Sequence, residues 1–364
     1  MKLAQVFQAV EETQFLKKLS LLDKLFLVGE SAPLEYIKNF FDNCKQSDNN
    51  YYCNWVEPNA IAIKGDRDLN SYQAIVVVSF EQEKSLFSQV KQQVASLDLD
   101  LPILRLFADI FVNHMCQRPL LDTGNLAAKP DISYAILTTP RSGSTYLCDL
   151  LDSTRIAGHP REDLRLAAQE LSLHCNFDYL ELLDSLRQCR TTDNGVFGTK
   201  LISHFLFELQ RCKPDFSQIF KSIDKFILLI RKDKVAQAVS LVVAQITEVW
   251  HLYGSANNLN YRSKLDNIEI DRALLDDVEQ KYYFINRQED RLRTILANYK
   301  IDPLEVIYED ILEDTPSQVN RILDFLGIVK PDSYTMQIES EIKKMPSSIS
   351  QEIIRQYHQK NTVC

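Results

Sequence analysis

Residues 132–147 read ISYAILTTPRSGSTYL, and this stretch indicates a buried strand that leads through a short loop into a helix. A hydrophobic run typical of a buried strand ends at Thr-Thr-Pro, and a basic, glycine-centred, hydroxyl-rich loop leads from it into a helical pattern. The first backbone N–H groups of a helix lack partners within the helix, and the helix dipole favours an anion there. The stretch therefore predicts a strand–loop–helix unit that holds a negatively charged group.

The side chains of the loop fit the same chemistry. The loop contains Arg141, which has a forked guanidinium, and Gly143, which has no side chain. It also contains three residues with hydroxyl groups, Ser142, Ser144 and Thr145. Taken alone, the motif is also compatible with a serine-capped helix that carries an exposed arginine. Hydrolysis of ATP or GTP is disfavoured, because the chain contains no G-x-x-x-x-G-K-[ST] sequence.

The bulk composition excludes several classes of protein. The chain has 364 residues, 45% of them hydrophobic, and a net charge of −9, which argues against a nucleic-acid partner. No stretch approaches the ~18 apolar residues of a membrane span, and the start is a poor signal peptide, so we expect a cytoplasmic protein. Eight cysteines without a C-x-x-C spacing indicate reduced thiols, and we expect no metal site.

Hydrophobic runs alternate with helical patterns along the whole chain, and the alternation predicts an α/β fold. Residues 1–125 predict a smaller α/β domain of unknown role, with strands at 25–30, 60–66 and 74–80. Residues 130–364 predict a second domain, with strands at 133–139, 195–203, 225–231 and 304–311 and helices at 144–154, 234–250 and 316–328. Near-continuous hydrophobic strands separated by helices are typical of a parallel sheet covered by helices on both faces.

A second polar cluster follows a later strand of the larger domain. Arg231 ends the strand and Ser240 lies in the helix after it, so both could reach one further phosphate at the carboxyl edge of the sheet. Lys232 could support them or could be a solvated surface lysine. Together the two clusters fit a ligand with two separated anionic groups.

These two clusters resemble those of the sulfotransferases that use 3′-phosphoadenosine-5′-phosphosulfate (PAPS). In that superfamily a P-[KR]-S-G-[ST]-[ST] loop binds the 5′-phosphosulfate, and an arginine and a serine after a later strand bind the 3′-phosphate. The stretch YEDILEDTPSQVNRILDFLGI (308–328) also resembles a pattern of the superfamily. The resemblance implies a P-loop-like sulfotransferase fold with PAPS as co-substrate and no metal.

Within the superfamily, the chain is most similar to the bacterial carbohydrate sulfotransferases typified by trehalose 2-sulfotransferase. Four stretches carry this resemblance: PRSGSTYL, IAGHPREDL (156–164), GVFGTKL (195–201) and RKDKVAQAVSLVVAQITEVW (231–250). It covers about residues 132–330 and says nothing of residues 1–130. The latter could recognise the acceptor, form a dimer contact or carry a second activity.

The resemblance also assigns roles to single residues. Arg141, Ser142, Gly143, Ser144 and Thr145 match the 5′-phosphosulfate loop. Arg141, at a position where many members have lysine, is implied to bind the sulfuryl or bridging oxygens and offset the charge of the leaving group. Arg231 and Ser240 match the pair that binds the 3′-phosphate.

Three further residues are candidates for catalysis. Glu162 falls where the family has its proposed catalytic carboxylate, and such a group would accept the proton of the attacking hydroxyl. Without the resemblance, a Glu162 that caps the next helix or pairs with Arg161 or Arg165 is the favoured interpretation. His159 stands where the family has an acidic residue, so it is a rival base or an acceptor-binding group, and Asp163 is a weaker third candidate. Lys200 matches a basic position that would approach the site, or it is a lysine at a strand end.

We therefore expect an enzyme that transfers the sulfuryl group of PAPS to a hydroxyl of a carbohydrate or glycolipid. Two alternatives stay open. One is a small-molecule kinase of related fold, and the other is a non-catalytic protein that binds PAPS. Trp250, at the end of the pattern, could stack on a sugar ring or pack in the core.

Overall fold

The computed structural model of the chain describes residues 2–44, 52–55, 69–124, 129–165, 170–171, 173–175, 177–212, 217–250, 256–330, 338–340 and 348–362. The chain forms two compact units. One consists of Met1–Ala128 with Asp163–Cys189, and the other of Lys129–Glu162 with Arg190–Cys364. The segment after Glu162 therefore belongs to the unit that contains the amino terminus.

The amino-terminal unit is built on a four-stranded parallel sheet in the order β2-β1-β3-β4. Its central strands are the runs LFLVG and AIVVV, which are buried along their whole length because helices cover both faces. The strands are β1 (Leu25–Gly29), β2 (Tyr52–Trp55), β3 (Ala74–Val78) and β4 (Ile103–Arg105). The helices are α1 (Lys2–Glu11), α2 (Phe15–Leu19), α3 (Ser31–Asn43), η1 (Leu69–Ser71), α4 (Glu83–Ser96), η2 (Leu106–Phe111), α5 (Val112–Met115) and α8 (Tyr179–Cys189).

Aromatic rings pack together beyond the carboxyl ends of this sheet. The order of the strands reverses between β1 and β3, a point at which open α/β sheets commonly form a ligand crevice. Phe80 follows β3, Phe107 follows β4, and their ring centroids lie 5.6 Å apart. Phe7 of α1 packs on both rings and stacks on Tyr36 of α3 at 4.3 Å. The chain's own side chains thus pack around this edge of the sheet.

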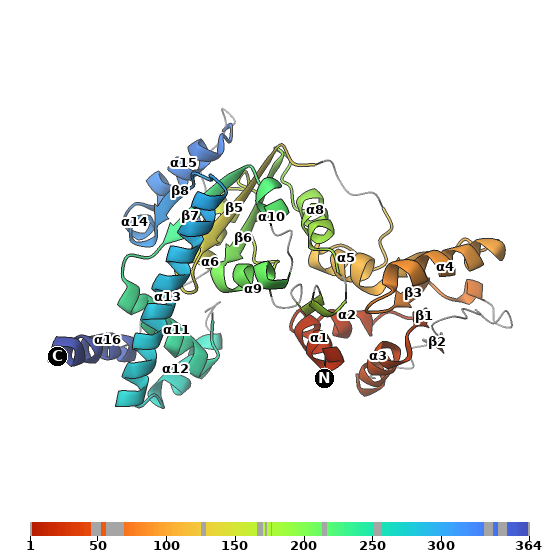
Figure 1. Cartoon of the computed structure of the whole chain (residues 1–364), viewed down its shortest axis with the longest axis horizontal. Helices are drawn as coiled ribbons and strands as arrows, with labels where there is room; N and C mark the ends of the chain where they lie inside the picture. The colour runs from red at the N-terminus through yellow and green to blue at the C-terminus, as the bar shows by residue number, and fades with distance from the viewer. Residues whose placement is uncertain are drawn as a thin grey trace. The chain divides into compact units, whose positions relative to one another are not determined.

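The second unit contains the predicted strand–loop–helix. Its sheet is also parallel, in the order β6-β5-β7-β8, with β5 at the centre beside β7 (Figure 1). The strands are β5 (Ile132–Thr138), β6 (Val196–Ile202), β7 (Lys225–Ile230) and β8 (Leu304–Ile307). The helices are α6 (Ser144–Ser153), α9 (Ser203–Cys212), α10 (Ser217–Lys221), α11 (Lys234–Thr247), α12 (Ala256–Asp266), α13 (Arg272–Asn298), α14 (Tyr308–Glu313), α15 (Thr315–Leu326) and α16 (Ser348–Thr362).

Helices cover both faces of this second sheet, as the hydrophobic runs predict. On one face α6 and α15 bury a core with β5, β7 and β8, to which Tyr134, Leu147 and Val306 contribute. The connection from β5 to β6 runs toward one edge of the sheet, whereas the connections from β6 to β7 and from β7 to β8 run toward the opposite edge. Because such connections are right-handed, α9, α11 and α13 lie on the other face of the sheet from α6. There α13 packs against β5 and α9 (Figure 1). The predicted fold class, a parallel α/β sheet preceded by a smaller α/β unit, is confirmed.

Some boundaries differ from the predicted ones. The strand predicted at 304–311 ends at Ile307, because Tyr308 begins α14, whose polar Glu309 and Asp310 no strand core would accommodate. The helix predicted at 234–250 ends at Thr247, where Glu248 adopts a left-handed conformation. Two short strands, β2 and β4, were not predicted, and the strand predicted at 60–66 lies outside the described residues. In the described part of the chain, no helix has the length and apolar character of a membrane span.

A buried carboxyl group in the amino-terminal unit links its stability to pH. Glu83 at the start of α4 accepts hydrogen bonds from the N–H groups of Phe107 and Ala108, at 2.8 and 3.2 Å. Burial raises the pKa of Glu83 to about 8, although these N–H groups and Arg105 oppose the shift. The unfolded chain ionises at a lower pH than the folded one, so the folded state loses stability as pH rises from about 4.5 to 8.

We expect the substitution Glu83→Gln to remove this loss. Each unit of pKa shift corresponds to about 1.4 kcal/mol. Between pH 4.5 and 8.5 the free energy of unfolding of the wild-type protein should therefore fall by up to ~5 kcal/mol more than that of the variant. Urea unfolding of both proteins across this range measures the difference, and comparison with the variant cancels the titration of other groups. Parallel losses in the two proteins would contradict the assignment to Glu83.

Candidate functional site

The loop after β5 has the backbone conformation of an anion cradle. Arg141 and Gly143 both lie in the left-handed region, with φ of 61° and 88°. Gly143 immediately precedes α6, whose first N–H groups have no partner within the helix. The loop therefore turns sharply out of the strand and leaves the N-terminus of α6 available to an anion.

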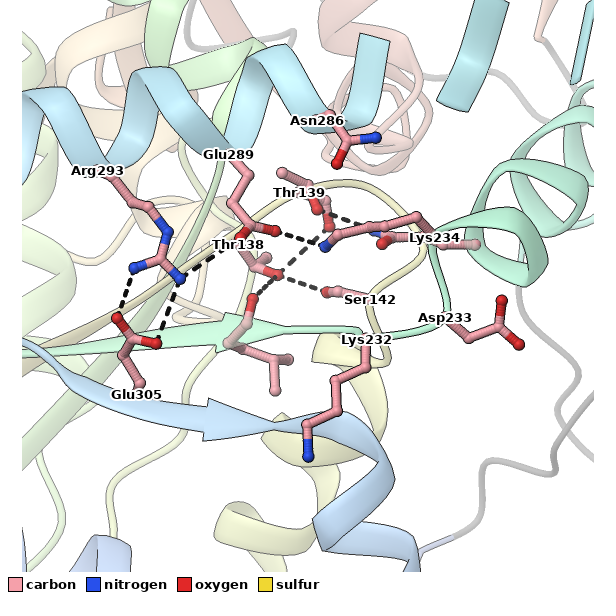
Figure 2. Close-up of polar contacts among 12 residues, drawn as sticks. Thr138, Thr139, Ser142, Lys232, Asp233, Lys234, Asn286, Glu289, Arg293 and Glu305 are labelled. Atoms are coloured by element: carbon pink, nitrogen blue, oxygen red, sulfur yellow. Dashed lines mark hydrogen bonds and ion pairs between the residues drawn. The ribbon is translucent and has the colours of Figure 1, made fainter. Parts of the chain in front are cut away.

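Buried hydroxyls hold the base of the loop to the sheet. Thr138, the last residue of β5, donates to the carbonyl of Leu229 in β7 at 3.0 Å. Its hydroxyl oxygen lies 2.5 Å from the hydroxyl of Ser142, which is fully buried (Figure 2). A hydroxyl has one hydrogen, so with the Thr138 hydrogen on Leu229 the Ser142 hydroxyl is the donor between them. The Ser142 side chain thus faces the sheet, and it shapes the loop from beneath.

Gln237 of α11 holds the other side of the loop. Its side chain is fully buried, and its amide nitrogen donates to the hydroxyl of Thr139 at 2.8 Å and to the carbonyl of Pro140 at 2.7 Å. The Pro140 carbonyl belongs to the peptide that enters Arg141, so this bond fixes the peptide just before the left-handed turn. Gln237 therefore stabilises the conformation on which the cradle depends.

Two arginines and a serine meet on one side of the loop. Arg141 Nε donates to the hydroxyl of Ser240 at 3.0 Å, and Arg231 Nη1 donates to the Arg141 carbonyl at 3.3 Å. A second nitrogen of Arg141 donates to the carbonyl of Trp250, a residue whose ring is partly exposed. The sequence predicted that Arg231 and Ser240 converge, and the resemblance implied that Arg141 binds the sulfuryl or bridging oxygens. The structure brings Arg141 to Ser240.

This group of cations is electrostatically suited to an anion. Burial and the nearby charge of Arg231 lower the pKa of Arg141, although a guanidinium stays protonated. The Nε of Arg231 is buried and has no hydrogen-bond partner among the described residues. Two neighbouring guanidiniums and an unused buried donor are the features of a phosphate-binding site.

Lys200 and Glu162 form a second polar group near the other end of the loop. Lys200 Nζ lies 2.9 Å from Glu162 Oε2, with the two side chains 5% and 22% exposed. The same nitrogen donates to the hydroxyl of Thr145, in the first turn of α6, at 3.2 Å. Lys200 thus links the loop to the predicted catalytic carboxylate.

The position of Glu162 follows from a short extension of the sheet. Arg161 pairs with Thr199 of β6 as a parallel bridge, and the Lys200 N–H donates to the Arg161 carbonyl at 2.9 Å. Gly158 lies against the backbone of β6 in a left-handed conformation, where an added Cβ would meet the Gly198 nitrogen at 2.8 Å. The segment therefore runs beside β6 and ends with Glu162 next to Lys200.

His159, the rival base, lies in a different place. Its Nδ1 is 2.5 Å from a carboxylate oxygen of Asp152, and this bond lowers the pKa of Asp152. Asp152 is near the carboxyl end of α6, whereas the loop is at the amino end of the same helix. The pair lines a cavity of about 790 Å³ together with Asp193 and Glu339.

Two other predicted residues can also be placed. Lys232 forms an exposed ion pair with Asp310 at 3.1 Å and extends away from Ser142 (Figure 2). It is therefore a surface lysine in this structure. Asp163 is buried in the amino-terminal unit, so it lies in a different unit from Glu162.

An ion-pair chain supports the first turn of α11 from behind. Lys234 contacts Glu289 of α13 at 2.5 Å, with both side chains largely buried. Glu289 also contacts Arg293, which reaches Glu305 of β8 at 2.5 Å (Figure 2). The chain thus joins α11, α13 and β8 near the turn that carries Arg231.

Sequence reasoning gave no role to Gln237 or Tyr308, although a signal existed for each. Gln237 precedes Ser240 by three residues, and residues three apart share one face of a helix. Tyr308 directly follows the carboxyl end of β8, the edge where open α/β sheets bind ligands. Once β8 is known to end at Ile307, Tyr308 becomes a site candidate.

The fold and the site define an α/β protein that presents a cationic loop and a carboxylate–lysine pair at the carboxyl edge of a parallel sheet. Residues 133–360 match the Stf0 sulphotransferase family. The chain belongs to this family, as its resemblance predicts, and is therefore an enzyme of the sulfotransferase class.

Two curated relatives agree with the family assignment. One, from Mycobacterium tuberculosis (strain Erdman), is 27% identical over 232 residues, which cover 53% of this chain and 84% of the relative. Another, from Mycolicibacterium smegmatis, is 26% identical over 235 residues, which cover 54% of this chain and 84% of the relative. Both are described as trehalose 2-sulfotransferase.

Replacement of Gln237 by leucine tests the support of the loop. The variant leaves the buried Pro140 carbonyl without its donor, so we expect the free energy of unfolding to fall by about 1–3 kcal/mol. The matched control is Gln245→Leu on the exposed face of the same helix, which should change it by less than ~0.5 kcal/mol. Urea denaturation measures both, and equal effects of the two substitutions would contradict a special role for Gln237.

Proposed function

We propose that the protein transfers the sulfuryl group of PAPS to a hydroxyl of a carbohydrate or glycolipid. The observation that carries the proposal is the arrangement of charges around one loop. Arg141, Arg231 and Ser240 form a cationic group on one side, and the pair of Lys200 and Glu162 reaches the first turn of α6 through Thr145. The N-terminus of α6 provides the anion site of the loop itself.

The cationic group fits the 3′-phosphate of the donor. Arg231 and Ser240 match the superfamily's pair for this group. The buried Nε of Arg231, which has no hydrogen-bond partner in the described part of the chain, is available to a phosphate oxygen. Because Arg141 donates to Ser240, we assign its side chain to the same phosphate. The N–H groups around Gly143 and at the start of α6 would then hold the 5′-phosphosulfate.

Lys200 and Glu162 fit the chemistry of transfer. Bound PAPS supplies an activated sulfuryl group, with adenosine 3′,5′-bisphosphate as the leaving group. Lys200 would offset negative charge on the leaving group, a role that we move to it from Arg141. Glu162 would orient the acceptor hydroxyl and accept its proton at a carboxylate oxygen. The ammonium group of Lys200 contacts both Glu162 and Thr145, and it therefore keeps Glu162, the proposed proton acceptor, beside the loop.

The position of His159 supports Glu162 as the base. His159 pairs with Asp152 near the far end of α6 from the loop, and Glu162 reaches the loop through Lys200. A proton acceptor must lie within hydrogen-bond reach of the reacting hydroxyl. The relatives described as trehalose 2-sulfotransferase favour a carbohydrate as the acceptor.

The substitution Glu162→Gln tests the assignment of the base. We expect sulfuryl transfer from labelled PAPS to fall about 10²- to 10⁴-fold, because the glutamine amide cannot accept the proton. The affinity for adenosine 3′,5′-bisphosphate, measured by calorimetry, should change far less. The matched control is His159→Gln, for which we expect transfer to stay close to the wild-type rate.

Measurements of transfer and of ligand binding distinguish the alternatives. A larger loss of transfer in His159→Gln than in Glu162→Gln would contradict the assignment of the base. Binding of the bisphosphate without transfer to any sugar in a broad panel would indicate a binding protein. Stabilisation by Mg-ATP and not by the bisphosphate would indicate a kinase, and the proposed function would then be wrong.

A further inference from the structure

The first three residues of α14 each contact a residue near the point where β7 ends. Tyr308, Glu309 and Asp310 follow β8, and Arg231, Lys232 and Asp233 follow β7, the neighbouring strand. Because parallel neighbours end at the same edge of the sheet, the two segments lie together there. Each residue of α14 makes a different kind of contact.

The ring of Tyr308 contacts both Arg231, after β7, and Gly143, in the loop after β5. The guanidinium carbon of Arg231 lies 5.3 Å from the ring centroid, within the range of a cation–π contact. The ring also packs on the loop, because a Cβ added at Gly143 would lie 2.2 Å from Tyr308 Cδ2. The Tyr308 ring therefore contacts both Gly143 and Arg231 and helps to fix their relative positions.

Glu309 fixes the backbone of the turn that carries Arg231. Its carboxylate accepts the N–H groups of Lys232 and Asp233 at 3.0 and 3.1 Å. Burial favours the neutral acid, yet these N–H groups and the charge of Arg231 hold the pKa of Glu309 below its usual value. Asp233 in turn accepts the Ala236 N–H at 2.8 Å and so caps α11. Glu309 thereby links the end of β7 to the start of α11.

Asp310 makes the weakest of the three contacts. Its ion pair with Lys232 is exposed, with side chains 40% and 62% accessible, and exposed pairs contribute little to stability. The pair involves neither Gly143 nor Arg231. Asp310 is therefore a matched control for its two neighbours.

We propose that Tyr308 and Glu309 are positioning residues that hold Arg231 at a set distance from the loop. This inference rests on the proposed function, because the distance matters for a ligand with two anionic groups. The consequence is selectivity: the site favours a nucleotide phosphorylated at both the 3′ and 5′ positions over one that carries the 5′-phosphate alone. Loss of the ring should reduce that preference more than it reduces binding in general.

The test compares two nucleotides, adenosine 3′,5′-bisphosphate and adenosine 5′-monophosphate. In Tyr308→Leu we expect the affinity for the bisphosphate to fall about 30-fold, which corresponds to the roughly 2 kcal/mol of a desolvated cation–π contact. The affinity for the monophosphate should fall less than ~3-fold, since that ligand does not need Arg231. Tyr308→Phe keeps the ring and should keep the preference, and Glu309→Gln should weaken it. Asp310→Asn should leave both affinities unchanged.

A second measurement needs no nucleotide. Phenylglyoxal modifies accessible arginines, and mass spectrometry of the peptides gives the rate at Arg231. We expect this rate to rise in Tyr308→Leu and to stay at the wild-type value in Asp310→Asn. If Tyr308→Leu does not fold, Glu309→Gln is compared with Asp310→Asn in both measurements.

The outcomes separate the inference from the proposed function. If Tyr308→Leu lowers the affinity for both nucleotides equally, or lowers neither, the inference is overturned while the proposed function stands. If the wild-type protein binds neither nucleotide, the proposed function fails, and the labelling alone decides the inference. An unchanged rate at Arg231 would then overturn it.

Discussion

The site depends on one backbone constraint, the pair of left-handed residues that turns the chain from β5 into α6. Arg141 and Gly143 adopt positive φ, which glycine tolerates but the side chain of Arg141 disfavours, so neighbouring contacts must hold the loop in place. Gln237 fixes the peptide before Arg141, the Ser142 hydroxyl bonds to Thr138, and the ring of Tyr308 packs on Gly143. These contacts come from α11, β5 and α14, so the sheet and its helices cooperate to maintain one loop.

The distribution of charge follows from the same geometry. All four strands of the sheet point their carboxyl ends at this edge, and each supplies a residue at or just beyond its end. Arg231 follows β7 and Tyr308 follows β8, while Lys200 lies in the last part of β6. The loop arginine turns toward Ser240, which leaves Lys200 as the cation beside Glu162. Two polar groups of different composition thus lie near one helix N-terminus, a cationic group around Arg231 and the pair of Lys200 and Glu162.

Local patterns predicted the fold well, and they predicted the site in part. Hydrophobic runs identify β5, β6 and β7. The rule that ligands bind beyond strand ends predicts that Arg231 and Ser240 meet, and in the structure Arg141 contacts each of them, through its carbonyl and its Nε. The pairing of His159 with Asp152, and the turn of Arg141 toward Ser240, depend on side-chain directions that spacing does not encode. Glu162 became a candidate only through resemblance, because a bridge between Arg161 and Thr199 of β6 places it, and Arg161 itself belongs to no regular pattern. The start of α14 was hidden because Ile307 and Tyr308 continue a hydrophobic run.

The central claim is that one loop and the turn after β7 hold the two anionic ends of a single nucleotide. A crystal structure with adenosine 3′,5′-bisphosphate tests this most directly. We expect the 5′-phosphate at the N-terminus of α6, beside Gly143, and the 3′-phosphate in contact with Arg231, Ser240 and the Arg141 side chain. A bisphosphate bound with its 3′-phosphate away from Arg231, or bound elsewhere on the protein, would contradict the account.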